Sequence, residues 1–286
     1  MSITSRLVPA MIALSAACMS GLAMAENLQG NGKGFIIKNL GLTQNGAPLL
    51  QSFYFRYTSD DHHISAIEVA PNVPAANKAS LAFSDKNRDD GYFYNITFAP
   101  YFGEIFRRTD AREHCTRGTC TYPIQAPPNR ADYVFVLRGF YIYYVGDDHH
   151  IDQIKVQENN GQVTVAFNDK NDDDRFRVDL HYAYIPKSRF SVVDERSGTA
   201  KGGQRVTIPA GTAVIRGFDF NFKSKDHHIK DFGVMQDGNG RMEVFYGDKN
   251  QDDTFDWNVQ YAVLSTRPAV LDPHRPVLDP RSAITD

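Results

Sequence analysis

Two polar blocks, each of which occurs three times, constrain the fold of this chain most strongly. The first reads Asp-His-His-Ile and begins at Asp61, Asp148 and Asp226. The second reads Asp-Lys-Asn, a variable residue and two Asp, and begins at Asp85, Asp169 and Asp248. We call them the Asp-His-His block and the Asp-Lys-Asn block. Successive second blocks lie 84 and 79 residues apart, which is too long for a propeller repeat of about 40 residues and suits a small β-sandwich.

The segments around the blocks alternate apolar and polar residues, the pattern of strands with one buried face. A long aromatic strand is expected before each Asp-His-His block, a hairpin between the blocks, and a fourth strand after each Asp-Lys-Asn block. No segment has a sustained helical period. The fold class predicted is therefore all-β, with three tandem antiparallel β-sandwich modules of about 80 residues that arose by internal triplication. The long strands are expected at 49–57, 134–145 and 214–222, and the fourth strands at 92–98, 176–184 and 255–263.

The domain organisation follows from these repeats and from the two ends of the 286-residue chain. Residues 1–25 read as a cleaved signal peptide, with Arg6, an apolar run and a small-residue end at Ala23-Met24-Ala25. A lipoprotein signal ending at Cys18 is the alternative. The modules are placed at 26–101, 102–186 and 187–266, and the Pro-rich residues 267–286 are expected to be extended. The Gly- and Asn-rich segment 26–34 is expected to be a loop rather than a strand.

Charge and cysteine content limit the compartment and the partners. The chain has 31 Lys and Arg against 34 Asp and Glu, and a formal net charge of −3, so nothing indicates a nucleic-acid partner. No segment beyond the leader is apolar for long enough to span a membrane. In an exported chain, secreted or periplasmic, Cys115 and Cys120 are expected to form a disulfide. A metal site that includes His114 is the alternative.

The Asp-Lys-Asn blocks have the Asp-x-Asn-x-Asp spacing of the first half of EF-hand-like calcium loops, although the Gly at position six and the Glu at position twelve are missing. Strand direction places both blocks at the same end of each module if consecutive strands pair as hairpins. The spacing therefore predicts Ca²⁺ sites. The alternative is that these side chains form metal-free Asx turns. The candidate calcium ligands are Asp61, Asp85, Asn87, Asp89, Asp148, Asp169, Asn171, Asp173, Asp226, Asp248, Asn250 and Asp252.

Six of the nine histidines lie in the Asp-His-His blocks, and adjacent residues of a strand point to opposite faces. One histidine of each pair is therefore expected to be a hydrogen-bonded core residue. The other interpretations are a ligand-contacting or second-shell imidazole and a ligand of Zn²⁺, which is disfavoured against Ca²⁺ because both members of a pair do not readily reach one ion. The residues concerned are His62, His63, His149, His150, His227 and His228.

These features favour an exported, non-enzymatic binding protein. The chain has no nucleophile elbow, phosphate loop or His-Glu-x-x-His helix, so no catalytic residue is assigned. Three equivalent sites suit avidity for a repetitive ligand, which predicts a calcium-assisted, lectin-like or adhesive array that binds glycan or a surface polymer. The first alternative is a structural or partner-binding envelope protein whose blocks are metal-free turn locks. The second is a metal-dependent hydrolase that uses one module. The sequence does not define an oligomeric state.

Overall fold

Alternating apolar and polar side chains place most of the chain in β-strands, as the sequence predicts. The structure is a computed structural model that describes residues 25–41, 46–71, 77–145, 147, 149–169, 171, 174–223 and 227–265. Within these residues it is all-β and forms three six-stranded antiparallel sheets, with two short 3-10 turns at Arg130–Asp132 and Lys187–Arg189. No helix in the described part of the chain is long and apolar enough to cross a membrane.

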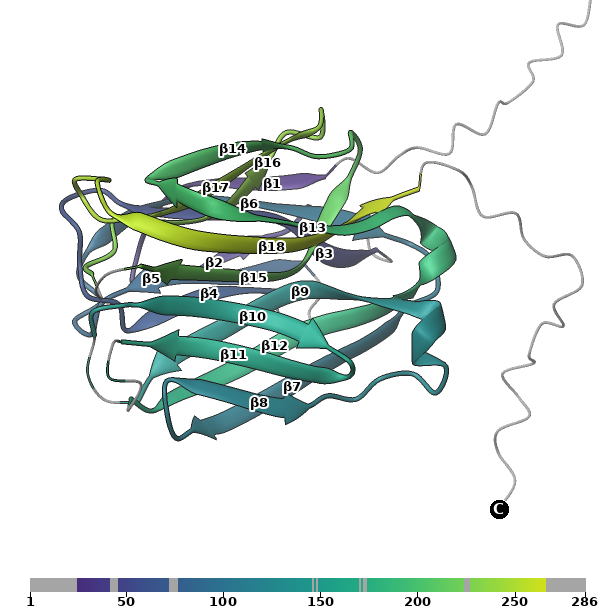
Figure 1. Cartoon of the computed structure of the whole chain (residues 1–286), viewed down its shortest axis with the longest axis horizontal. Helices are drawn as coiled ribbons and strands as arrows, with labels where there is room; N and C mark the ends of the chain where they lie inside the picture. The colour runs from purple at the N-terminus through teal and green to yellow at the C-terminus, as the bar shows by residue number, and fades with distance from the viewer. Residues whose placement is uncertain are drawn as a thin grey trace, which may run out of the picture.

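The strands of the three sheets are labelled in Figure 1, and the sheets have equivalent strand orders when sheet 2 is read from β7 to β2. Sheet 1 has the order β1 (Glu26–Lys33), β6 (Gly91–Tyr101), β3 (Ala47–Tyr57), β16 (Asp231–Gln236), β17 (Arg241–Gly247) and β14 (Gly203–Thr207). Sheet 2 has the order β2 (Phe35–Asn39), β5 (Lys78–Ser84), β4 (Ala66–Pro71), β9 (Tyr133–Tyr144), β12 (Phe176–Pro186) and β7 (Phe106–Cys115). Sheet 3 has the order β13 (Phe190–Lys201), β18 (Thr254–Leu264), β15 (Ala213–Phe222), β10 (Gln153–Asn159), β11 (Gln162–Asn168) and β8 (Thr119–Pro123).

Each sheet combines strands from two chain segments that are far apart in sequence. β3 pairs with β6 and β16, not with β4, so the strands on either side of an Asp-His-His block belong to different sheets. The assumption that these strands form a hairpin is therefore wrong, whereas β4 and β5 do pair as expected. The chain changes sheets at both kinds of block. The blocks nevertheless lie at one end of the molecule, on the left in Figure 1.

The core is shared by the three sheets rather than divided among them. The central strands β3, β9 and β15 contact one another, and a fully buried phenylalanine from each strand lies in this contact. The ring centroids of Phe53, Phe140 and Phe218 are 5.0 to 5.3 Å apart. Aromatic pairs at this spacing stabilise a core beyond the area that they bury. The three sheets therefore surround a common axis, along which β3, β9 and β15 pack together. The Asp-His-His blocks lie at one end of this axis.

The expected loop at 26–34 is wrong, because residues Glu26–Lys33 form the edge strand β1 against β6. A Cβ at Gly32 would lie 2.7 Å from the ring of Tyr92, and one at Gly30 would lie 2.9 Å from the hydroxyl of Tyr94. The glycines that suggested a loop instead leave room for two tyrosine rings from the neighbouring strand.

Cys115 and Cys120 lie at disulfide distance, with their Cα atoms 5.6 Å apart. They join the end of β7 to β8, which are edge strands of sheets 2 and 3. The predicted leader and the Pro-rich tail fall outside the described residues, apart from Ala25.

Candidate functional site

The three Asp-His-His blocks meet at the end of the common core and hydrogen-bond to one another. Reciprocal backbone bonds join His62 to Ile229, Ile64 to His149, and Ile151 to His227, with N···O distances of 2.9 to 3.1 Å. Each block therefore bonds to both of the others, and the bonds close a ring around the axis. The three isoleucines are fully buried on the inner side of this ring.

The first histidine of each pair binds the last carboxylate of the Asp-Lys-Asn block in its own segment. The Nδ1–Oδ2 distance is 2.8 Å for His62 and Asp90, and 3.0 Å for His149 and Asp174 and for His227 and Asp253. Each of these imidazoles also packs against an aromatic ring of the preceding strand, at centroid distances of 4.2 to 4.6 Å from Tyr57, Tyr144 and Phe222. The first histidines are thus partly buried groups that tie the two blocks of each segment together.

The second histidine of each pair points the other way, towards the axis. The centroids of the imidazoles of His63, His150 and His228, which we call the axial histidines, are 4.4 to 4.5 Å apart. The Nε2 atoms of His150 and His228 are 2.8 Å apart. Burial, and then the neighbouring imidazoles of His63 and His150, lower the pKa of His228 below its usual value.

The Asp-Lys-Asn blocks begin as turns. Oδ1 of Asp85 accepts the backbone N–H of Arg88 at 2.8 Å, and Oδ1 of Asp248 accepts that of Gln251 at 2.7 Å. Asp169 accepts the N–H of Asn171 at 2.8 Å in the same way. These are the bonds of the Asx-turn alternative.

Carboxylates also gather around the turns. In the first block, Asp85, Asp89 and Asp90 offer ligand oxygens within 4.8 Å of one another. Burial, chiefly, raises the pKa of Asp90, while the imidazole of His62 lowers it. In the other two blocks the equivalent groups contain a first histidine, with Asp169 and Asp174 beside His149, and Asp248 and Asp253 beside His227. Only the first block therefore offers an all-oxygen group among the described residues.

The candidate calcium ligands differ in their surroundings. Asp85 and Asp89 belong to the all-oxygen group, whereas Asp169 and Asp248 belong to the mixed groups. Asp61 instead accepts the backbone N–H of Lys249 at 3.4 Å. Asp252 belongs to no group of convergent His, Cys, Asp or Glu ligand atoms within the described residues. Asp148, Asp173 and Asp226 lie outside the described residues.

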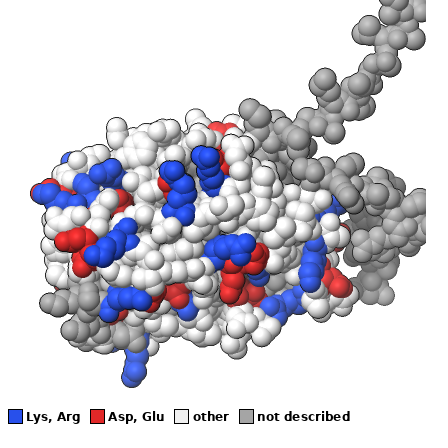
Figure 2. Space-filling model, turned by 45° about the horizontal axis from the view of Figure 1, so that its top comes forward, with Lys and Arg blue, Asp and Glu red and all other residues white. Residues whose placement is uncertain are grey.

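Ion pairs between segments also hold the blocks together. Nζ of Lys249 lies 2.6 Å from Oδ1 of Asp60, and Lys86 pairs with Asp147. The acidic partners precede the Asp-His-His blocks, and sequence reasoning missed them together with Asp90, Asp174 and Asp253. The sequence contained a signal for the last three, because the sixth residue of every Asp-Lys-Asn block is an Asp. Figure 2 shows positive and negative side chains interspersed on one face of the molecule, without an extended area of one sign.

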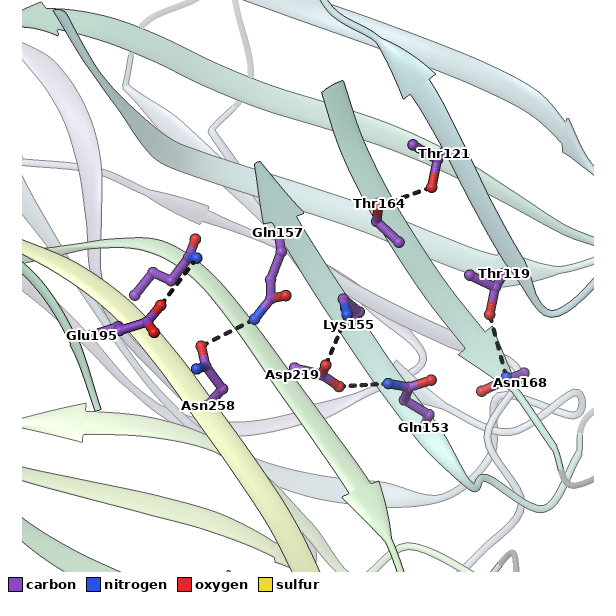
Figure 3. A network of polar contacts seen from close by, with 11 residues as sticks. Thr119, Thr121, Gln153, Lys155, Gln157, Thr164, Asn168, Glu195, Asp219 and Asn258 are labelled. Carbon is purple, nitrogen blue, oxygen red and sulfur yellow. Dashed lines mark hydrogen bonds and ion pairs between the residues drawn. The ribbon is translucent and has the colours of Figure 1, made fainter. Parts of the chain in front are cut away.

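The outward faces of the sheets differ in chemistry. On sheet 3, side chains of β8, β11, β10, β15 and β18 bond to one another, for example Gln153 and Lys155 to Asp219 at 2.6 and 3.0 Å (Figure 3). On sheet 2, the rings of Tyr141 and Tyr143 stack with centroids 4.5 Å apart. Burial, and then the charge of Asp179, raises the pKa of nearby Glu68 to about 7.

Comparison with protein-family models finds no match, and neither does comparison with curated protein sequences. The geometry of the chain is therefore the basis for any functional conclusion.

Proposed function

We propose that this chain is an exported, non-enzymatic binding protein, made of three modules from an internal triplication and produced after signal-peptide cleavage. Its ligand is a glycan or another surface polymer, contacted with the help of calcium. The observation that carries the proposal is that all three pairs of polar blocks gather at one end of the molecule. Polar blocks that occur in all three copies and gather at one end favour a role in binding, because turns that are only solvated do not need to share one end.

Calcium is assigned to the first Asp-Lys-Asn block. Asp85, Asp89 and Asp90 supply the hard oxygen ligands that Ca²⁺ prefers. The mixed imidazole and carboxylate groups of the other blocks are poorer calcium sites, since nitrogen is a poor ligand for this ion. We therefore expect one calcium site per chain, although the spacing alone predicts three.

The stacked Tyr141 and Tyr143 support a glycan as the ligand class. Their rings leave an aromatic surface on sheet 2, and Phe35, which is 37% exposed, contacts Tyr141 at its edge. A flat aromatic surface next to the partly buried carboxyl group of Glu68 combines apolar contact with a polar group that can hydrogen-bond to sugar hydroxyls.

A calcium titration of the purified protein, followed by calorimetry and by Tm, tests the proposal. Asp89→Asn is expected to weaken calcium binding at least tenfold, because it removes a carboxylate from the all-oxygen group. Asp252→Asn is the matched control, since it changes the equivalent position of the third block, outside the convergent groups. A Tm that neither chelator nor calcium changes contradicts the calcium site. A glycan panel without binding, with and without calcium, contradicts the ligand class.

The second candidate function is a structural or partner-binding envelope protein whose blocks are turn locks. The Asx bonds of Asp85, Asp169 and Asp248 favour it, because they give each block a role without a metal. Under this alternative, Asp248→Ala, which removes the oxygen that accepts the N–H of Gln251, destabilises the fold by about 1 kcal/mol. Calcium then changes the stability of neither the wild type nor the variant.

A further inference from the structure

The axial histidines are held by the backbone from both sides. His63 lies between His62 and Ile64, whose main chains bond to two different blocks. The same holds for His150 between His149 and Ile151, and for His228 between His227 and Ile229. The convergence of the three imidazoles is therefore built into the ring of backbone bonds. Three side chains placed this way are pre-organised for a common ligand.

The distances among the axial histidines fit one metal ion. Their ligand nitrogens all lie within 4.8 Å of one another, and the Nε2 atoms of His150 and His228 are 2.8 Å apart. Imidazole nitrogens bind Zn²⁺ at about 2.0–2.1 Å, which places the nitrogens of a tetrahedral site about 3.3 Å apart. The separations of 2.8 Å for one pair and at most 4.8 Å for the others lie on both sides of that spacing.

The ligand type selects the class of ion. Among the described residues the axial group contains imidazoles alone, without carboxylate or thiolate. Such a set suits zinc, copper and nickel and disfavours calcium and magnesium. Fully buried Ile64, Ile151 and Ile229 close the inner side of the ring, whereas His150 is exposed. A fourth ligand therefore comes from the solvent side, as in zinc sites with three protein ligands and a water.

We propose that His63, His150 and His228 form a three-nitrogen site for one late first-row divalent transition-metal ion, with Zn²⁺ as the test ion and the outer coordination position open to solvent. Adjacent histidines of one strand do not readily reach the same ion. In this site each chain segment supplies only one histidine, so that constraint does not apply. The site is separate from the calcium site at Asp85, Asp89 and Asp90.

Zinc titration of chelator-treated, dialysed full-length mature protein tests the site by calorimetry. We expect one Zn²⁺ per chain and a Tm that rises with free zinc, because the ion cross-links three distant segments of the native state. His150→Ala removes an exposed ligand and is expected to weaken zinc binding on the order of 100-fold or more. His149→Ala is the matched control. It removes the adjacent imidazole, which binds Asp174 rather than the axis, so it is expected to retain one zinc per chain.

Three results overturn the proposal: no zinc bound to folded wild-type protein, unchanged affinity in folded His150→Ala, or zinc lost from folded His149→Ala with His150→Ala unaffected. If His150→Ala does not fold, X-ray absorption of zinc-loaded wild-type protein decides. A first shell of three imidazoles and one light atom supports the axial site, and a carboxylate-rich shell contradicts it. Asp89→Asn leaves zinc binding unchanged, so the calcium and zinc proposals fail independently.

Discussion

At the residue scale, the two histidines of each Asp-His-His block have different tasks. The sequence correctly suggests that they separate, because adjacent residues of an extended chain face opposite sides. It does not show that His62 binds Asp90, or that His63 meets His150 and His228. Those neighbours come from other parts of the chain, so their identity depends on the arrangement of the sheets rather than on the local pattern.

Glu68 gives a residue-scale prediction about pH. Its pKa is raised to about 7 from 4.5, first by burial and then by the charge of Asp179. Between these values the folded state holds a proton that the unfolded state has lost, so stability falls as pH rises from about 4.5 to 7. Glu68→Gln removes this titration. We expect the variant to be more stable than wild type by ~2 kcal/mol at pH 8 and about equal at pH 4, measured by urea unfolding.

Asp179→Asn is the companion variant for that measurement. It removes the neighbouring charge, so it is expected to lower the pKa of Glu68 and to shift the loss of stability to lower pH. If Glu68→Gln and wild type differ equally at pH 4 and pH 8, the effect is a packing effect and the assignment of the titration is wrong.

At the element scale, most strands and the hairpins between the blocks, such as β4 and β5, were predictable, but the pairing of strands from different segments was not. The expected strands 49–57 and 176–184 lie within β3 and β12, which the structure extends by two residues at one end. Apolar alternation identifies such strands because each has one buried face. The same alternation carries no information about which strand pairs with which, so the pairing of β3 with β16 could not be predicted.

The edge strand β1 provides the element-scale prediction. Tyr92 is fully buried and donates to the carbonyl oxygens of Gly34 and Leu81, so its ring does not move aside readily. Gly32→Ala places a methyl group against that ring, and we expect a loss of about 1–3 kcal/mol in unfolding free energy. Asn31→Ala is the control, because Asn31 is exposed on the same strand. Equal stability of the two variants contradicts close packing of β1 on β6.

At the scale of the whole molecule, each sheet is built from strands of two chain segments. Residues 26–186 contain β1, β6 and β3 of sheet 1 but lack β16, β17 and β14. A fragment with these residues leaves β3 without one of its two neighbours and exposes the phenylalanine core. We expect the fragment to unfold without a cooperative transition, followed by near-ultraviolet circular dichroism, and to regain that signal when mixed with residues 187–265. Cooperative unfolding of the fragment alone contradicts this prediction.

The pairing of β3 with β16 also determines when the protein becomes able to fold during synthesis. β3 ends at Tyr57 and its partner begins at Asp231, so the ribosome must add more than half of the chain before they can meet. Until then the hydrogen-bonding edge of β3 is open to other nascent chains. Long sequence separation between contacting strands also slows folding. We therefore expect the open edge of β3 to need protection in the growing chain until β16 has been made.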